Sequence, residues 1–267
     1  MNRLVARLEL ARSRTLLFWL ILLLGFYSGF MVTYYPRMAQ NVEAVNKLMD
    51  LWPKEMLAAF SIEGNLMEKG NFFNVYIFTL IWPWLAAIAG ILIPTRTVAA
   101  DLEHGFLELP LSTPISRPRY LISAIAVQIV VMAGLTLSMI VPILVVAPLV
   151  GVSLDTGRFI LVGLLCFALG CGIAAATTLL SVATLSRGRA GGLVAGGLVV
   201  MYMIQTMARL SPDMSGPAYA GVFHYFSPTP VIRDGVVPLG DLAVLSLTAL
   251  TCWVVAVWAF RRRDLIA

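Results

Sequence analysis

The sequence predicts an all-α integral membrane protein with six transmembrane helices. Sixty per cent of its 267 residues are hydrophobic and only 12 per cent are charged, whereas charged residues make up about a quarter of a typical soluble domain. The mean hydropathy is +0.88. Six apolar runs are as long as the ~18 residues that indicate a spanning helix, and they occupy most of the chain. We therefore predict one transmembrane domain over residues 1–267, with no separate soluble domain.

The six predicted spans are separated by segments of very different length. In chain order the spans are residues 15–35, 75–93, 120–141, 159–185, 190–207 and 242–260. Arginines precede the first span, as in a secretory signal, but the apolar core of a signal has only ~7–15 residues. The first span is longer, so we interpret it as a membrane anchor. We expect Pro142 and Pro148 to kink or end the third span near the outer face.

The distribution of basic residues predicts that both termini are cytoplasmic. With both ends inside, the inner segments carry twelve arginines and the outer segments carry seven basic residues. The inner ones are Arg3, Arg7, Arg12, Arg14, Arg96, Arg117, Arg119, Arg187, Arg189, Arg261, Arg262 and Arg263. An excess of Lys and Arg marks the cytoplasmic loops of membrane proteins. The basic pI of about 9.3 therefore reflects membrane topology and does not indicate a nucleic-acid partner.

Three segments outside the spans have patterns of their own. Residues 1–14 alternate apolar side chains with arginines, which predicts a short amphipathic helix that lies along the inner interface. This helix either anchors the chain or touches a partner. In the outer loop 36–73, residues 42–52 place apolar side chains at helical spacing, which predicts an amphipathic helix. Residues 211–240 are rich in Pro, Gly and aromatics, and we expect re-entrant or interfacial helices there, before the sixth span.

Two rows of small residues at intervals of four predict close helix packing. The first row is Gly170, Ala174 and Thr178, and the second row is Gly188, Gly192 and Gly196. Small residues at this spacing let helix backbones approach closely in lipid, where packing replaces the hydrophobic effect between helices. Each row can serve either packing inside one subunit or a subunit interface, and the second row is our candidate for subunit packing.

The predicted spans contain none of the groups that energise transport or catalyse hydrolysis. No Asp, Glu, Lys, Arg or His lies inside them, whereas ion-coupled carriers use an intramembrane ionisable group. The chain also contains no GxxxxGK[ST] phosphate-binding loop. His104 and His224 are assigned to opposite faces, so we predict no metal site. We expect no enzymatic activity in this chain, and the energy for any active process has to come from another chain.

The polar stretch 99–119, between the second and third spans, is predicted to be a cytoplasmic surface that a partner contacts. Exposed backbone and carboxylates are too costly in hydrocarbon, so such a loop lies in water or against another protein. A helix with the acidic Asp101, Glu103 and Glu108 and with apolar neighbours such as Phe106 suits a protein partner. Its apolar side chains can enter a groove while the carboxylates meet basic residues at the rim.

The same stretch carries a sequence motif. It reads Asp101-Leu102-Glu103-His104-Gly105-Phe106-Leu107-Glu108-Leu109, followed by Ser112-Thr113-Pro114-Ile115-Ser116-Arg117. A second motif, Phe260-Arg261-Arg262-Arg263-Asp264-Leu265, lies near the C-terminus. Together with the six spans and the inside location of both ends, these motifs resemble the permease subunit of type-2 ATP-binding-cassette (ABC) exporters. Phe106 and Pro110 differ from the threonine and leucine that are usual at these positions in the family. The motif therefore does not define where a helix formed by this loop ends.

The resemblance implies a transporter that is driven by a partner. In this family the loop forms the coupling helix that sits on the ATPase, which implies a coupling surface at Asp101, Glu103, Gly105, Phe106, Glu108 and Arg117. It also implies two ABC ATPase subunits, which bind ATP and Mg²⁺, and a second permease subunit, identical or related. The expected activity is export of a lipophilic or amphiphilic compound across the plasma membrane, the inner membrane of a bacterium or archaeon. The alternative is a non-transporting membrane anchor or mechanical transducer for a cytoplasmic ATPase.

Overall fold

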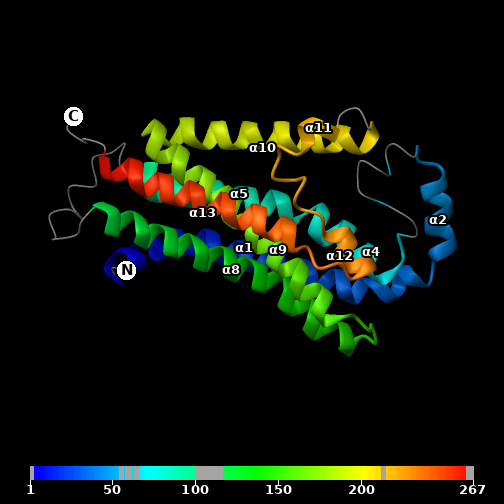
Figure 1. Ribbon diagram of the computed structural model, residues 1–267. Coiled ribbons are helices and arrows are strands. Elements are labelled where there is room, and N and C mark those ends of the chain that lie inside the picture. Colours follow the sequence, from blue (N-terminus) through cyan, green and yellow to red (C-terminus); the bar gives the residue numbers. More distant parts are fainter. Residues whose placement is uncertain are drawn as a thin grey trace.

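Six long helices dominate the structure, a computed structural model that describes residues 3–53, 57, 62, 66–99, 117–211 and 215–262. The described residues contain helices and turns but no strand. Six helical stretches are long and apolar enough to cross a membrane, namely Ser13–Ala39, Lys69–Val98, Pro118–Leu149, Thr156–Thr184, Arg187–Leu210 and Leu239–Arg262. They run side by side, and the first begins at the end of the bundle where the last one ends (Figure 1). The predicted all-α fold with six membrane-spanning helices is confirmed.

The second span differs from the others because it is a composite of short segments. In chain order the helices are α1 (Arg3–Ala39), α2 (Val42–Asp50), α4 (Lys69–Phe73), η1 (Asn74–Thr79), α5 (Trp82–Pro94), η2 (Thr95–Ala99), α8 (Arg117–Leu149), α9 (Thr156–Thr184), α10 (Arg187–Leu210), α11 (Ser215–Ala218), α12 (Pro228–Asp234) and α13 (Leu239–Arg262). Both η1 and η2 are π-helical. Wider π-helical turns inside longer helices are frequent at functional sites, and here they lie near the two ends of one span.

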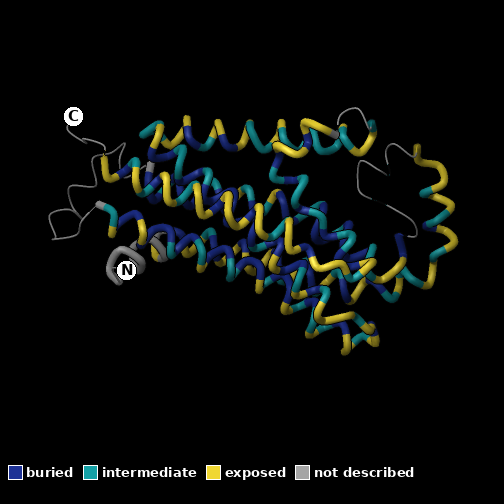
Figure 2. Tube along the Cα trace, viewed as in Figure 1, coloured by how far each residue is buried: buried dark blue, intermediate teal, exposed yellow. Residues whose placement is uncertain are grey.

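The helix α9 is the centre of the bundle. Of its most apolar 18 residues 72% are buried, compared with 17% for α13 and 6% for α10. It packs against α5, α8, α10 and α13, while α1 packs mainly against α8. The fully buried Phe73, Phe78 and Trp82 belong to the core around it. Figure 2 shows the buried residues along the inward faces of the helices.

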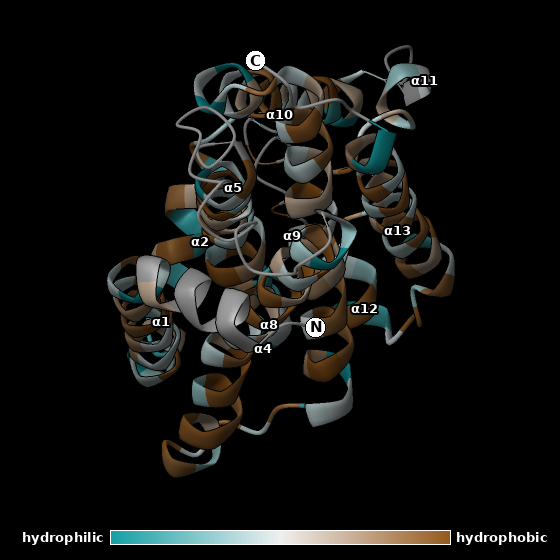
Figure 3. Cartoon of the chain, turned by 90° about the vertical axis from the view of Figure 1, so that its left-hand side faces the viewer, coloured by the Kyte–Doolittle hydropathy of each residue, from teal (hydrophilic) through white to brown (hydrophobic). Residues whose placement is uncertain are grey.

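The outer faces of the helices are apolar as well as exposed. On α10, Leu193, Val200 and Met203 are exposed, and on α13 Leu247 and Val254 are exposed. Figure 3 shows hydrophobic residues on the outward-facing side of several helices. A continuous apolar surface of this kind is rare on soluble monomers and is typical of a membrane or partner contact. The exposed surface therefore agrees with a multi-pass membrane protein.

Several helix boundaries differ from those predicted. The expected short helix over residues 1–14 is not a separate element, because α1 begins at Arg3 and continues into the first span without a break. The third span continues through Pro142, and α8 ends at Leu149, directly after Pro148, so the predicted end of the span near these prolines is found at Pro148 and not at Pro142. Proline is tolerated in transmembrane helices because neighbouring groups satisfy the freed backbone. The helices also extend beyond the apolar runs, since backbone hydrogen bonding continues into the polar residues at their ends.

The segments between the spans contain the short helices that the sequence suggested. In the 36–73 segment, α2 has Val45 buried while Leu48 is exposed. Before the sixth span, α12 packs against α4, η1 and α9, and it buries Val231 and Ile232. The re-entrant or interfacial position of α12 stays a prediction.

A close approach between α5 and α9 depends on Gly90. A Cβ atom at this position would lie 2.8 Å from Cγ2 of Ile173 and 3.3 Å from the backbone nitrogen of Ala174. We therefore expect Gly90→Ala to lower the free energy of unfolding by about 1–3 kcal/mol, because overpacking forces the two helices apart. Thermal unfolding of the purified protein in detergent measures this effect.

The matched control is Gly134→Ala on α8, because no atom lies within 4 Å of a Cβ atom at that position. Both changes raise helix propensity by a similar amount, up to about 1 kcal/mol, so the difference between the two variants isolates the clash. Equal stability of the two variants would show that α5 and α9 can separate without cost.

Candidate functional site

Most of the predicted coupling surface lies outside the described residues. This is the case for Asp101, Glu103, Gly105, Phe106 and Glu108. Arg117 is the first residue of α8, and its side chain also lies outside the description. The coupling surface therefore stays a prediction, and the structure contributes the two helix ends from which the loop emerges.

These two helix ends are joined by a buried hydrogen bond. The second span ends with η2 at Ala99, and α8 begins 18 residues later at Arg117. The hydroxyl of Tyr120, in the first turn of α8, donates a hydrogen bond to the backbone carbonyl of Thr97 at 2.6 Å. Both residues are almost fully buried. This hydrogen bond therefore holds together the two helix ends that flank the loop.

A small apolar cluster surrounds this hydrogen bond and is distinct from the main core. It consists of Val98, Tyr120, Leu121, Ile125, Val182, Ala256 and Phe260. These residues come from η2, α8, α9 and α13, and they lie at the end of the bundle where α13 ends (Figure 1). We call this set the base cluster. Because packed interiors transmit displacement with little compression, movement of the loop base has to move several spans together.

The two rows of small residues turn out to have different surroundings. Gly170, Ala174 and Thr178 are buried on α9, and a Cβ atom at Gly170 would lie 2.9 Å from Sδ of Met132. This row packs inside the chain, which is one of the two predicted alternatives.

The second row faces open space. No atom lies within 4 Å of a Cβ atom placed at Gly188, Gly192 or Gly196. The inward face of α10 is formed instead by residues that include the buried Ala190 and Val194. The glycine row is therefore accessible to another molecule, and its role in subunit packing stays a prediction.

The charged residues of the six described spans lie only at the helix ends. Each of them falls within the first or last three residues of its span, and they are Arg14, Arg37, Lys69, Arg96, Arg119, Arg158, Arg187, Arg189, Arg209, Asp241, Arg261 and Arg262. Charges at span ends can reach the membrane interface. The described middle of the bundle thus holds polar groups that are neutral.

One neutral polar cluster connects three spans. The side-chain oxygen of Gln128 on α8 accepts hydrogen bonds from the Thr178 hydroxyl of α9 at 3.0 Å and from the Trp253 indole of α13 at 3.3 Å. Gln128 is 1% exposed. Hydrogen bonds between helices stabilise membrane bundles, so this cluster supports packing of the spans. Gln128 is a single polar residue in an apolar run of the sequence, which indicates a possible contact between helices. Its hydrogen-bond partners on α9 and α13 could not be inferred from the sequence.

His224 has an aromatic environment. Its ring lies 4.2 Å from that of Tyr219 and 5.1 Å from that of Tyr225, measured between centroids. Within the part of the chain that the structure describes, no three His, Cys, Asp or Glu side chains are grouped so that they could hold a metal ion. His224 therefore packs among the aromatic rings of the segment between the fifth and sixth spans.

Comparison with known proteins shows the family of this chain. Residues 4–265 match the model of a family described as ABC-2 family transporter protein. A search of the curated proteins returned no significant match. The family match covers almost the whole sequence, and it agrees with the six apolar helices and with the loop motif. Proteins of this family are membrane permeases of ABC transporters, are not themselves catalytic, and act with ABC ATPase subunits. The chain belongs to the ABC-2 family of transporter proteins.

Proposed function

We propose that this chain is one permease half of an ATP-driven exporter for a lipophilic or amphiphilic compound. It pairs with a second permease, identical or related, and with two ATPase subunits that bind ATP and Mg²⁺. The family match supports the permease role. The neutral middle of the bundle supports an apolar cargo, because a tightly bound small ion needs ionisable or strongly polar ligands in the membrane.

The base cluster is the observation that carries the proposal. It connects the ends of the predicted coupling loop, at Ala99 and Arg117, to α9 and α13. A displacement of the loop by an ATPase would therefore act on several spans at once. Rigid-body movement of packed helices is an established way in which a local change becomes a global one. In this proposal the loop transmits movement and performs no chemistry of its own.

The second permease is proposed to pack against the exposed face of α10. The open row at Gly188, Gly192 and Gly196 supports this arrangement, since small residues allow close contact between helices in lipid. The compound would then pass between the two halves. The membrane in question is proposed to be the plasma membrane, with both termini on the cytoplasmic side.

The decisive experiment measures ATP hydrolysis by the complete complex. Full-length tagged protein is isolated from its native membrane together with the ATPase that accompanies it, and the complex is reconstituted into lipid vesicles. A transporter is expected to hydrolyse ATP faster when lipophilic or amphiphilic candidate compounds are added, and to move the stimulating compound across the membrane. ATP hydrolysis that responds to none of these compounds, without movement of any of them, would instead identify a membrane anchor or mechanical transducer.

A further inference from the structure

Three adjoining pockets follow the contact between α5 and α10. The first, of about 340 Å³, is lined by residues within 84–92 of α5 and 195–199 of α10, and we call it the apolar groove. The last, of about 180 Å³, reaches Arg209 at the end of α10 that lies opposite the base cluster (Figure 1), and we call it the polar pocket. The narrow pocket between them shares Trp84, Ala87 and Leu198 with the apolar groove, and Pro83, Tyr202 and Phe223 with the polar pocket.

The apolar groove suits a hydrocarbon chain. Every side chain that lines it is hydrophobic. The lining residues Trp84, Ile88 and Val199 are between 44% and 49% exposed, so the groove is open to the surroundings of the bundle. Both helices that form it belong to predicted spans. An exposed apolar surface of this kind contacts lipid or an apolar partner.

The polar pocket presents hydrogen-bond donors from two helices. Gln205 and Arg209 are four positions apart on α10, so their side chains are neighbours on one face of the helix, and both line the pocket. The Thr79 hydroxyl and the Gln205 amide nitrogen make no hydrogen bond with any described residue, and neither atom is fully enclosed. A group with several acceptor oxygens can therefore bind at Gln205 and Arg209 together.

The charged side chains of the polar pocket favour an anion. Arg209 and Arg233 line it, and no Asp or Glu is among its described lining residues. Arg233 pairs at 3.0 Å with Asp234, which is not part of the lining. A guanidinium has five N–H donors and no acceptor, and its planar shape matches the oxygens of a phosphate. A cationic group such as choline would be repelled by the two arginines.

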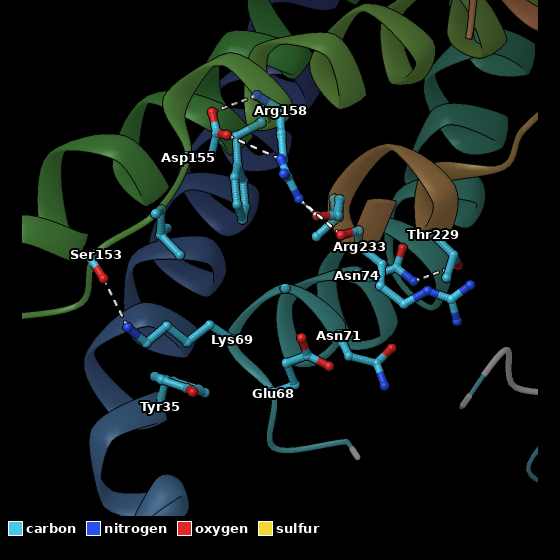
Figure 4. Close-up of a pocket in the computed structure, with 14 residues that line it drawn as sticks. Tyr35, Glu68, Lys69, Asn71, Asn74, Ser153, Asp155, Arg158, Thr229 and Arg233 are labelled. Atoms are coloured by element: carbon cyan, nitrogen blue, oxygen red, sulfur yellow. Dashed lines mark hydrogen bonds and ion pairs between the residues drawn. The ribbon is translucent and has the colours of Figure 1, made fainter. Parts of the chain in front are cut away.

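A larger neighbouring pocket helps to hold α12 beside the polar pocket. Thr229 and Arg233 line both pockets, and Figure 4 shows the larger one, of about 490 Å³. There the Arg158 guanidinium donates to the backbone carbonyls of Ile232 at 2.8 Å and Arg233 at 2.9 Å. The amide of Asn74 donates to the Thr229 hydroxyl at 2.7 Å. These bonds join α9 and η1 to α12, so they fix one wall of the polar pocket.

The track from the polar pocket to the apolar groove has the length of one leaflet. Arg209 and Ala195 are 14 positions apart on α10, which corresponds to about 21 Å along the helix at 1.5 Å per residue. The hydrocarbon core of a bilayer is about 30 Å thick, so one leaflet contributes roughly 15 Å. A lipid with its head group at the end of the span would therefore place an acyl chain in the apolar groove.

We infer that an anionic phospholipid of the surrounding leaflet binds along α5 and α10, with its phosphate in the polar pocket and one acyl chain in the apolar groove. The phosphate accepts hydrogen bonds from Arg209 and Gln205, and the chain runs past Tyr202 and Trp84. A lipid with net negative charge is favoured over one that carries choline, because the head group lies beside two guanidiniums. The site is separate from the coupling loop and requires no transport.

The first test compares two lipids that have the same acyl chains. The full-length protein is reconstituted in nanodiscs with equal amounts of phosphatidylglycerol and phosphatidylcholine, and native mass spectrometry counts the lipids that it retains. Phosphatidylglycerol is expected to be retained several-fold more often than phosphatidylcholine. Equal retention of the two lipids, or retention of neither, would overturn the inference.

Variants connect retention to the two parts of the site. Arg209→Gln removes a guanidinium and is expected to weaken phosphatidylglycerol binding about tenfold, the effect of losing one charge-assisted hydrogen bond. Ala195→Phe fills the apolar groove without changing the charge and is expected to lower retention as well. Both positions are exposed, so the fold is expected to stay intact.

Each variant has a matched control. Arg37→Gln removes an exposed arginine from the end of α1, outside the three pockets. Leu193→Phe enlarges an exposed side chain of α10 that does not line the groove. Both controls are expected to retain phosphatidylglycerol like the unchanged protein. If they lose as much lipid as Arg209→Gln and Ala195→Phe, the retention reflects the general surface and the site is refuted.

Two other occupants of the apolar groove would give different results. Calorimetric binding of palmitate to a protein that does not retain phosphatidylglycerol would assign the site to a free single-chain amphiphile and overturn the lipid assignment. If Ala195→Phe separates two copies of the chain and leaves lipid retention unchanged, the groove is a contact with the second permease and the lipid assignment is also wrong. These measurements need neither an ATPase nor transport, so their outcome is independent of the function proposed above.

Discussion

Reversing the charges of Glu103 and Glu108 together is expected to release the ATPase from the permease without unfolding the spans. In the proposed complex both carboxylates face basic residues at the rim of the groove on the ATPase. Glu103→Lys with Glu108→Lys would place like charges against one another, which costs several kcal/mol. A loss of about 3 kcal/mol corresponds to an affinity on the order of 100-fold lower. The measurement is the amount of ATPase that co-purifies with the tagged protein.

The control reverses two carboxylates that are far from the two helix ends at Ala99 and Arg117. Glu43 and Asp50 are exposed on α2, at the opposite end of the bundle (Figure 1). Glu43→Lys with Asp50→Lys makes the same change in net charge and is expected to leave ATPase binding intact. Undiminished co-purification of the ATPase with the Glu103/Glu108 double variant would contradict the coupling role of the loop.

Replacing Trp82 with alanine is expected to cause the largest loss of stability. Trp82 is 0% exposed, and its indole nitrogen donates to the backbone carbonyl of Cys166 at 3.1 Å. Removal of such a side chain leaves a cavity, which costs about 3–5 kcal/mol, and it leaves a buried carbonyl without this partner. We expect a strongly lowered unfolding temperature in detergent and a reduced yield of folded protein.

Trp84 is the matched control, since it lies two residues away on the same helix and is 49% exposed. The substitution Trp84→Ala removes a side chain of the same size that faces outward, and it is expected to change the unfolding temperature far less. A Trp82→Ala protein as stable as Trp84→Ala would mean that α5 does not pack against α9 at this point. Trp82→Phe fills part of the cavity and is expected to have an intermediate effect.

Much of the fold followed from the sequence because the membrane restricts the possible structures so strongly. A backbone in hydrocarbon has to satisfy its hydrogen bonds internally, so each long apolar run has to be a helix. Local periodicity likewise predicted α2. The boundaries were less accurate because apolar runs show where hydrocarbon can lie, whereas helices continue through polar ends and through Pro142.

The sites were predicted to different extents. The candidate coupling loop could be proposed because its motif is continuous in the sequence, and its coupling role stays a prediction. The hydrogen bond between Tyr120 and Thr97 could not be predicted, because it joins residues 23 positions apart and nothing local indicates that they meet. A pocket of about 490 Å³ at the end of the bundle was missed for the same reason, since its lining residues are scattered between Tyr35 and Arg233.

The sequence alone determined that this is a membrane protein with six spanning helices and no charged groups in the middle of the predicted spans, because composition decides which segments can enter hydrocarbon. The tertiary structure alone decided which small residues pack inside. Gly170 and Gly192 belong to rows with the same spacing, yet the first lies against Met132 and the second faces open space. Spacing defines the face of a helix on which residues lie, whereas only the arrangement of all six helices determines what that face contacts.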